Sequence, residues 1–247
     1  WLATVVVSGI SYLSYLLKRY VFHESGVLVS GIIGGLYSST ATISVLARKS
    51  RKASEQEANE YVAAMLLAVS MMFLRFMILI LIFSREIFTS IYPYLLIMSV
   101  VAAVVAWFIH SRHRRSKDMA DESEDEDSSN PLEFKVALIF ATLFVVFTVL
   151  THYTLVYAGT GGLNLLSFVS GFSDITPFIL NLLQNTGSVA ALIITACSMQ
   201  AIISNIMVNM FYALFFAGKG SKLRPWILGG FGVVIACNFV LLLFFYL

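Results

Sequence analysis

Five long runs of apolar residues constrain this chain more than any other feature of its sequence. An α-helix needs roughly 20 apolar residues to cross the hydrocarbon layer of a bilayer, and each run is long enough. Because only 12% of the residues are charged, against about 25% in soluble domains, a water-soluble core cannot account for all of the runs. We therefore expect an all-α, polytopic membrane bundle embedded in the lipid bilayer, with residues 1–22 as a sixth crossing. The five runs are 60–84, 87–110, 134–158, 189–217 and 226–247.

Two further apolar stretches are interrupted by small and polar residues. Residues 26–48 read GVLVSGIIGGLYSSTATISVLAR, and residues 161–184 read GGLNLLSFVSGFSDITPFILNLLQ. In a helix interior glycine costs about 1 kcal/mol and proline, here Pro177, about 3 kcal/mol. Serine and threonine hydroxyls can bond the backbone groups that such a break leaves unpaired. Both stretches are therefore predicted to be discontinuous helices.

A strongly charged segment divides the chain. Residues 111–131 read SRHRRSKDMADESEDEDSSNP, with basic side chains first and acidic side chains after them. Such a segment buries little, so we interpret it as a solvated linker, with a regulatory or cation-collecting role as the alternative. It separates a first membrane repeat at residues 1–110 from a second at residues 132–247.

The two halves resemble each other. Each half runs helix, interrupted segment, helix, helix. A shift of 136 positions also matches identical residues in the two interrupted segments, namely Gly26 with Gly162, Gly35 with Gly171, Thr40 with Thr176, and Ile43 with Ile179. Small-residue bias inflates such matches, but the shared order of elements strengthens the prediction of an internal repeat.

The positions of basic residues bear on topology. Basic clusters occur at 48–52, 112–117 and 219–224, and cytoplasmic loops are enriched in Lys and Arg. If both interrupted segments crossed completely, the last two clusters would lie on opposite sides of the membrane. If each segment enters and leaves on one side, all three clusters are cytoplasmic. We favour this re-entrant arrangement, which makes the halves inverted-topology repeats in an inner (cytoplasmic) membrane with a cytoplasmic linker.

The polar tips of the interrupted segments are the first candidates for a solute site. In the re-entrant arrangement each tip begins a half-helix, whose free N–H groups attract negative charge. The same hydroxyls can simply cap helices and allow close backbone packing. The candidate residues are Gly35, Ser38, Ser39, Thr40 and Thr42 in the first tip, and Ser173, Asp174 and Thr176 in the second.

Arg75 is the most unusual single residue, because it lies near the middle of the run 60–84. Arginine at that depth costs about 2.5–3.5 kcal/mol even on lenient insertion scales, so it needs a partner, water or an anion. An ion pair with Asp174 is one hypothesis, direct anion binding is another, and a purely structural pair is a third. Asn205 and Asn209 lie one turn apart and are candidates to line the same cavity, although such amides more often bond between helices.

Several function classes find no support in the sequence. It contains no GxSxG, Walker, HExxH or CxxC motif, and Cys197 and Cys237 lie inside apolar runs without ligand spacing. The net charge of +2 does not indicate a nucleic-acid partner. We expect a protein that is not an enzyme and holds no cofactor and no metal.

Two stretches resemble a known family. GGLYSSTATISVLARKSR (34–51) and AAMLLAVSMMFLRFMILI (63–80) are similar to the membrane domain that follows an MgtC/SapB-like domain in many prokaryotic proteins. Residues 171–174 resemble a later G-[LF]-[ST]-D stretch of that group. The resemblance spans residues 26–245 and departs at Asn209, where the family often has a basic residue. It implies this membrane architecture but no particular substrate.

The sequence thus favours a membrane channel or secondary transporter for a small inorganic ion or polar solute. The half-helix N-termini and Arg75 favour an anion. The alternative is a non-transporting membrane protein that binds and regulates another membrane complex. An intramembrane enzyme acting on lipid would need paired acidic or histidine residues, which we do not find. A homodimer is compatible with the sequence but is not established by it.

Overall fold

The structure is a computed structural model whose regular elements, in the part of the chain that it describes, are all helices. The predicted helix at 1–22, apart from Gly9 and Tyr12, lies outside the described residues, as do Ser173 and all of the linker except Ser111. The residues described are 9, 12, 26–51, 53, 55–111, 134–172, 174–184, 189–218 and 221–246. The helices are α2 (Val27–Lys49), α3 (Glu55–Phe83), α4 (Arg85–Ser111), α5 (Phe134–Ser170), α6 (Ile175–Gln184), α7 (Ala191–Ala217) and α8 (Arg224–Tyr246).

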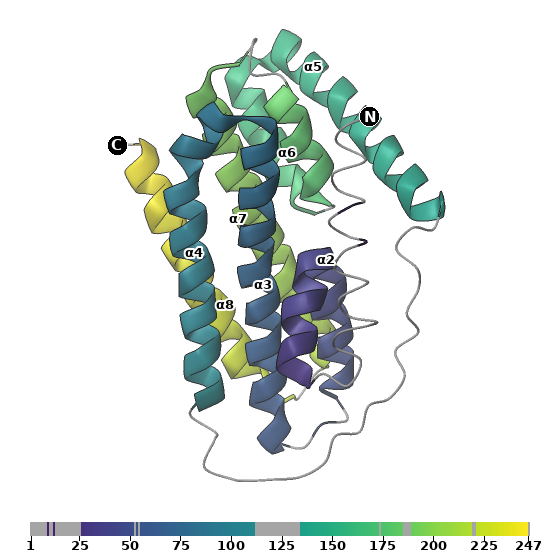
Figure 1. Cartoon of the computed structure of the whole chain (residues 1–247), viewed down its shortest axis with the longest axis vertical. Coiled ribbons are helices and arrows are strands. Elements are labelled where there is room, and N and C mark those ends of the chain that lie inside the picture. The colour runs from purple at the N-terminus through teal and green to yellow at the C-terminus, as the bar shows by residue number, and fades with distance from the viewer. Residues whose placement is uncertain are drawn as a thin grey trace.

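By length and composition, five of the described helices could cross a membrane, namely α2, α3, α4, α7 and α8. Four of these, α3, α4, α7 and α8, extend along the long axis of the molecule (Figure 1). The predicted crossing at 134–158 forms part of α5, whose described apolar stretch is Val145–Gly159. The prediction of a helical, multi-pass membrane protein is confirmed as far as the length and composition of the helices show it. Which membrane the protein occupies, and which loops face the cytoplasm, stay predictions.

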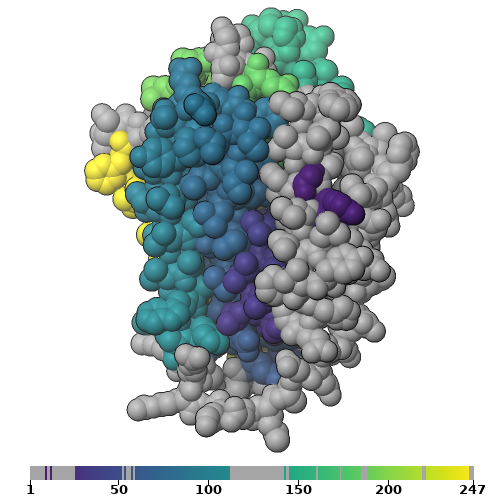
Figure 2. Space-filling view, in the orientation of Figure 1, coloured from purple at the N-terminus to yellow at the C-terminus, as the bar shows by residue number. Residues whose placement is uncertain are grey.

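Apolar side chains also cover the outside of the bundle. Along α4, large apolar residues follow one another on the exposed face at about one helical turn, and Figure 2 shows this helix at the surface of the molecule. A soluble protein rarely exposes such a continuous apolar stripe, whereas lipid tails solvate it. The stripe consists of Tyr92, Leu96, Val100, Val104 and Trp107.

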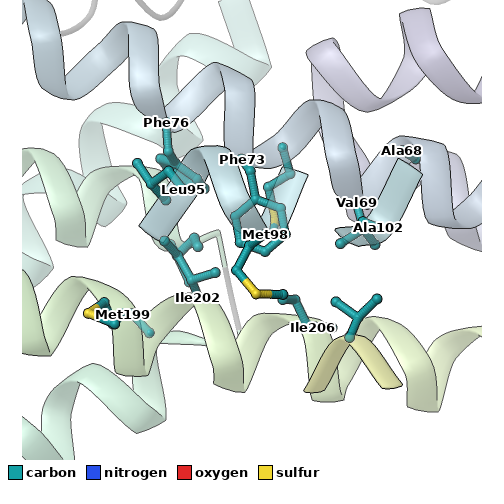
Figure 3. Packing of buried hydrophobic residues seen from close by; sticks show 14 of the residues in the cluster. Ala68, Val69, Phe73, Phe76, Leu95, Met98, Ala102, Met199, Ile202 and Ile206 are labelled. Carbon is teal, nitrogen blue, oxygen red and sulfur yellow. The ribbon is translucent and has the colours of Figure 1, made fainter. Parts of the chain in front are cut away.

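The interior is packed between α3, α4 and α7. Figure 3 shows side chains of these three helices meeting, with Phe73 from α3, Met98 from α4 and Ile202 from α7, and all three are fully buried. Between membrane helices this dense van der Waals packing replaces the hydrophobic effect as the main stabilising term. The packed interior fixes α3 and α7, the two helices that carry Arg75, Asn205 and Asn209.

Helix α2 folds back on itself at Ser38, which has non-helical backbone angles (φ −156°, ψ 106°). A Cβ placed on Gly34 would lie 2.5 Å from Oγ1 of Thr42, whereas residues eight apart in a continuous helix are separated by about 12 Å. The two halves, α2a (27–37) and α2b (39–49), therefore lie side by side, as Figure 1 also shows. Each half is roughly 16 Å long, about half of a bilayer core. The predicted interruption of segment 26–48 is thus present at Ser38.

The second predicted interruption separates α5 from α6. Helix α5 bends at Gly159 (φ 57°, ψ −148°), a left-handed conformation that glycine adopts without strain. Its last part, Gly161–Ser170, is called α5b below, and the chain leaves helical geometry after Ser170 before α6 begins at Ile175. Helix α6 lies in the upper half of Figure 1, and α2 lies in the lower half. The placement of these breaks relative to the two leaflets stays a prediction.

Candidate functional site

The side chain of Arg75 joins the two helix breaks. Its Nη1 donates a 2.7 Å hydrogen bond to the carbonyl oxygen of Tyr37, the residue before the break in α2. Its Nη2 donates a 3.2 Å bond to Oγ1 of Thr176, in the first turn of α6. Arg75 lies in the C-terminal half of α3 and is only 8% exposed. One guanidinium thus contacts two breaks that are far apart in the sequence.

The guanidinium is not fully satisfied. The Nε atom of Arg75 is buried and has no hydrogen-bond partner. Buried polar groups without a partner are rare in proteins, and a charged one is especially costly. The buried guanidinium therefore lacks one of the hydrogen bonds that it could make.

Each half-helix that follows a break carries an oxygen cap. In α2b, the Ser38 hydroxyl oxygen accepts a 3.3 Å bond from the backbone N–H of Ala41. In α6, Oδ1 of Asp174 accepts a 2.9 Å bond from the backbone N–H of Thr176. These bonds satisfy donors that the first turn of a helix leaves free. Ser38 and Asp174 are 136 positions apart, the offset that aligns the two interrupted segments.

Asp174 reaches Arg75 indirectly. The two side chains interact electrostatically, but the carboxylate bonds to the backbone of Thr176 and Thr176 in turn accepts from Arg75. The direct ion pair that we considered from the sequence is therefore replaced by a relay through Thr176. Asp174 is exposed, unlike the arginine.

The first interrupted segment packs on α3 through glycines. A Cβ on Gly31 would lie 2.3 Å from the carbonyl oxygen of Ala64, and one on Gly35 would lie 2.5 Å from Cα of Ala68. Only a hydrogen fits at either position, which is how small residues allow the backbones of membrane helices to approach. The predicted site residue Gly35 therefore sets the distance between the break and α3.

The second interrupted segment packs on α7 in an equivalent way but with polar groups. The hydroxyl of Ser167 donates a 2.7 Å bond to Oε1 of Gln200, and a Cβ on Gly171 would lie 2.3 Å from the side chain of Ser204. Adding 136 to the numbers of the pair Gly31–Ala64 gives the pair Ser167–Gln200. The same addition converts the contact between Gly35 and Ala68 into the contact between Gly171 and Ser204.

Two asparagines of α7 form a chain of hydrogen bonds that starts at the second break. Nδ2 of Asn205 donates to the carbonyl oxygen of Gly171 at 3.2 Å, and Nδ2 of Asn209 donates to Oδ1 of Asn205 at 3.1 Å. Because Asn205 must donate to a carbonyl, the orientation of both amides is fixed. Oδ1 of Asn209 is left buried without a partner.

The asparagines lie at the level of the first break. At the far end of α2b, the guanidinium of Arg48 lies 4.4 Å from the ring centroid of Phe216 on α7. Arg51, which follows α2, donates to the carbonyl oxygens of Phe215 and Phe216. Both α2b and α7 run toward this contact. Seven residues before Arg48 and Phe216, about two turns in each helix, Ala41 and Asn209 therefore lie at the same height. We infer that both breaks, Arg75 and the asparagine pair share one level of the bundle.

The remaining predicted residues surround the first break. Ser39 is buried, and Thr40 and Thr42 are half-buried. The carbonyl oxygen of Thr40 accepts a 2.8 Å bond from the Ser44 hydroxyl, while Thr42 faces Gly34. Ser173 lies outside the described residues. In the part of the chain that the structure describes, no cluster of three or more His, Cys, Asp or Glu side chains could hold a metal ion.

Some residues of the junction were not predicted from the sequence. Tyr37 contributes a backbone carbonyl, which carries no side-chain signal. Ser167, which bonds to Gln200 on α7, looked like any other hydroxyl of an apolar helix. The 136-residue offset identifies this contact only once the contact between Gly31 and Ala64 is known from the structure.

The fold and the junction define a multi-pass helical membrane protein in which two broken helices meet at a buried arginine. The chain belongs to the family described as a domain of unknown function, DUF4010, whose model matches residues 5–217. It is similar to an uncharacterized protein of Aquifex aeolicus (strain VF5), with 26% identity over 200 residues that cover 80% of this chain and 85% of the relative. No solved structure matches the chain. The association with an MgtC/SapB-like domain stays a prediction.

Proposed function

We propose that this protein is a channel or secondary transporter for a small inorganic ion or polar solute, with an anion favoured. The observation that carries the proposal is the position of Arg75, which bonds both helix breaks while its buried Nε has no partner. Broken helices that meet inside a bundle expose backbone polar groups there, which is a recurring construction for solute sites in transporters.

The equivalent contacts of the two halves support an internal repeat. Caps at Ser38 and Asp174 and the glycine contacts at Gly35 and Gly171 all follow the single offset of 136. In our proposal the two interrupted segments enter the membrane from opposite leaflets, which makes the repeats inverted. The halves α2a and α2b, each roughly half a bilayer core in length, suit a segment that enters and leaves on one side. The proposed membrane is the inner (cytoplasmic) membrane, with the linker in the cytoplasm.

The chemistry follows from the groups that converge at the junction. A solute that leaves water loses its hydration shell and requires replacement partners inside the membrane. Arg75, the Thr176 hydroxyl and the first-turn N–H groups of α2b and α6 supply such partners at one level of the bundle. We expect the solute to bind there during its passage.

The test is flux into proteoliposomes that contain the purified full chain, measured for a panel of inorganic anions, inorganic cations and small polar solutes. Arg75→Gln removes the buried charge, and we expect it to reduce the protein-dependent flux at least tenfold, which corresponds to about 1.4 kcal/mol. Arg85→Gln is the matched control, because Arg85 is exposed at the start of α4. Normal flux in the Arg75 variant, or no flux in the wild-type protein, would contradict the proposal.

The second candidate is a non-transporting membrane protein that regulates another membrane complex. It is favoured by the hydrogen bonds that many polar side chains of the second half make with one another, such as Ser167 with Gln200 and Asn209 with Asn205. Interhelical bonds of this kind stabilise membrane bundles without any solute. Absence of flux, together with co-purification of a stoichiometric membrane partner, would favour this candidate.

A further inference from the structure

We infer that Arg48 and Arg51, which converge on Phe216 of α7, form a binding site for the headgroup of an anionic phospholipid. The site lies where α2b and α7 end, which is called the basic end of the bundle below. The inference does not depend on the proposed function, because it uses none of the residues at the junction of the two breaks.

The first argument is the geometry around Phe216. The guanidinium of Arg48 lies over the Phe216 ring, 4.4 Å from its centroid. Arg51 donates from Nε to the carbonyl oxygen of Phe216 and from Nη2, at 3.3 Å, to that of Phe215. Two guanidinium groups are therefore held at one place on α7. In the described part of the chain, no carboxylate forms a salt bridge with either of them.

The second argument is the hydrogen-bonding capacity that remains. Arg51 uses its Nε and Nη2 on the two carbonyls, whereas the side chain of Arg48 makes no hydrogen bond to any described residue. Both side chains are exposed. A guanidinium over an aromatic ring loses mobility but keeps N–H groups that point away from the ring. Such a fixed fork suits bidentate binding of phosphate oxygens.

The third argument is the position at the edge of the apolar surface. Phe211 and Phe215 are exposed and stack on each other along α7, and the ring centroids of Phe215 and Phe216 are 5.3 Å apart. Exposed apolar side chains of a membrane helix face lipid tails, and the ends of the helix lie near the headgroups. An acyl chain along Phe211 and Phe215 therefore places its phosphate near Arg48. This position favours a lipid over a soluble anion or the acidic residues of the linker.

The fourth argument is the charge of the basic end. The helix dipoles nearly cancel there, because α2a, α3 and α8 begin at this end while α2b, α4 and α7 finish at it (Figure 1). Among the side chains that the structure describes at this end, five basic ones stand against two acidic ones, Glu57 and Glu60. A zwitterionic headgroup carries its own cation, so an anionic headgroup fits this excess better. The basic residues are Arg48, Lys49, Arg51, Lys222 and Arg224.

The experiment measures the thermal unfolding temperature of the purified full chain in detergent micelles that contain increasing amounts of dioleoyl phosphatidylglycerol. Dioleoyl phosphatidylcholine at the same molar fractions tests a zwitterionic headgroup, and sodium phosphate at matched ionic strength tests a soluble phosphate. A ligand that binds the folded state raises the unfolding temperature in a saturable way. We expect saturable stabilisation by phosphatidylglycerol, a smaller shift with phosphatidylcholine, and none with sodium phosphate.

Two variants assign the effect to the site. Arg48→Gln removes the charge over the ring, and the apparent affinity for phosphatidylglycerol should fall about fivefold, since a basic side chain near an anionic surface contributes about 1 kcal/mol. Phe216→Leu keeps both arginines and the carbonyls that Arg51 bonds but removes the ring beneath Arg48. It should weaken the binding by about two- to fivefold. Arg85→Gln, at the exposed start of α4 and thus at the opposite end of the bundle, should keep the wild-type affinity.

The outcomes decide the inference as follows from the site. Equal stabilisation by the two phospholipids, unchanged phosphatidylglycerol affinity in both Arg48→Gln and Phe216→Leu, or a shift with sodium phosphate as large as that with phosphatidylglycerol overturns it. Phosphatidylglycerol binding that emerges only after the acidic residues of 118–127 are changed to Asn and Gln also overturns it, because the linker would then be the occupant of the basic end.

Discussion

The hydroxyl of Ser167 donates a 2.7 Å hydrogen bond to Gln200 across the interface between α5b and α7. At the equivalent place in the first half, 136 residues earlier, Gly31 packs directly against Ala64. The same geometric position is thus occupied by a polar contact in one half and by a close backbone contact in the other. The two halves should therefore respond differently to substitution.

The close contact at Gly31 predicts intolerance to a single methyl group. Because a Cβ there would lie 2.3 Å from the carbonyl oxygen of Ala64, Gly31→Ala must push α2a away from α3. We expect a loss of about 1–3 kcal/mol of stability, the usual cost of overpacking, measured by thermal unfolding in detergent. Gly232→Ala in α8 is the control, since no atom lies within 4 Å of its Cβ position. Equal effects of the two substitutions would contradict the packing described here.

The hydroxyl of Thr176 predicts a cost for its removal. Thr176→Val keeps the shape of the side chain but removes the acceptor of the Arg75 Nη2 bond, which leaves a second unsatisfied donor on a buried guanidinium. Hydrogen bonds to charged groups contribute about 1.5–3 kcal/mol, so we expect a loss in this range and weaker solute binding. Thr89→Val is the control, because Thr89 is exposed and its hydroxyl donates to the carbonyl oxygen of Glu86 within α4. A variant as stable as the control would show that Arg75 does not depend on Thr176.

Much of this architecture follows from the sequence for simple physical reasons. The break at Ser38 was predicted because glycine, serine and threonine accumulate where an apolar helix should continue. Arg75 was identified because a charge in the middle of a crossing needs compensation. The sequence suggested Asp174 as its partner and did not identify Tyr37, since every residue has a backbone carbonyl and nothing in the sequence distinguishes that of Tyr37. The bend at Gly159 falls between the predicted crossing 134–158 and the predicted interrupted segment 161–184, because the glycines at 159, 161 and 162 mark that boundary in the sequence.

The cap at Asp174 can be separated from its charge. Asp174→Ala removes both the charge and the bond to the N–H of Thr176, and loss of a cap costs about 1 kcal/mol. Asp174→Asn removes only the charge and is expected to stay within about 0.5 kcal/mol of the wild-type protein. Thermal unfolding in detergent measures both variants. If both lose the same stability, the carboxylate charge rather than the cap organises the start of α6.

Tyr94 and Asn238 provide a test that should change stability and leave the solute site alone. The phenolic hydroxyl of Tyr94 on α4 donates to Oδ1 of Asn238 on α8, and both residues are buried. Tyr94→Phe leaves that amide oxygen without its donor, at a cost of about 1–3 kcal/mol. In the double variant Tyr94→Phe, Asn238→Leu neither polar partner remains. We therefore expect the double variant to be more stable than the sum of the single losses predicts, as a double-mutant cycle measures. Additive losses would show that the two residues are not coupled, and a change in protein-dependent flux would show that this pair is linked to the junction at Arg75.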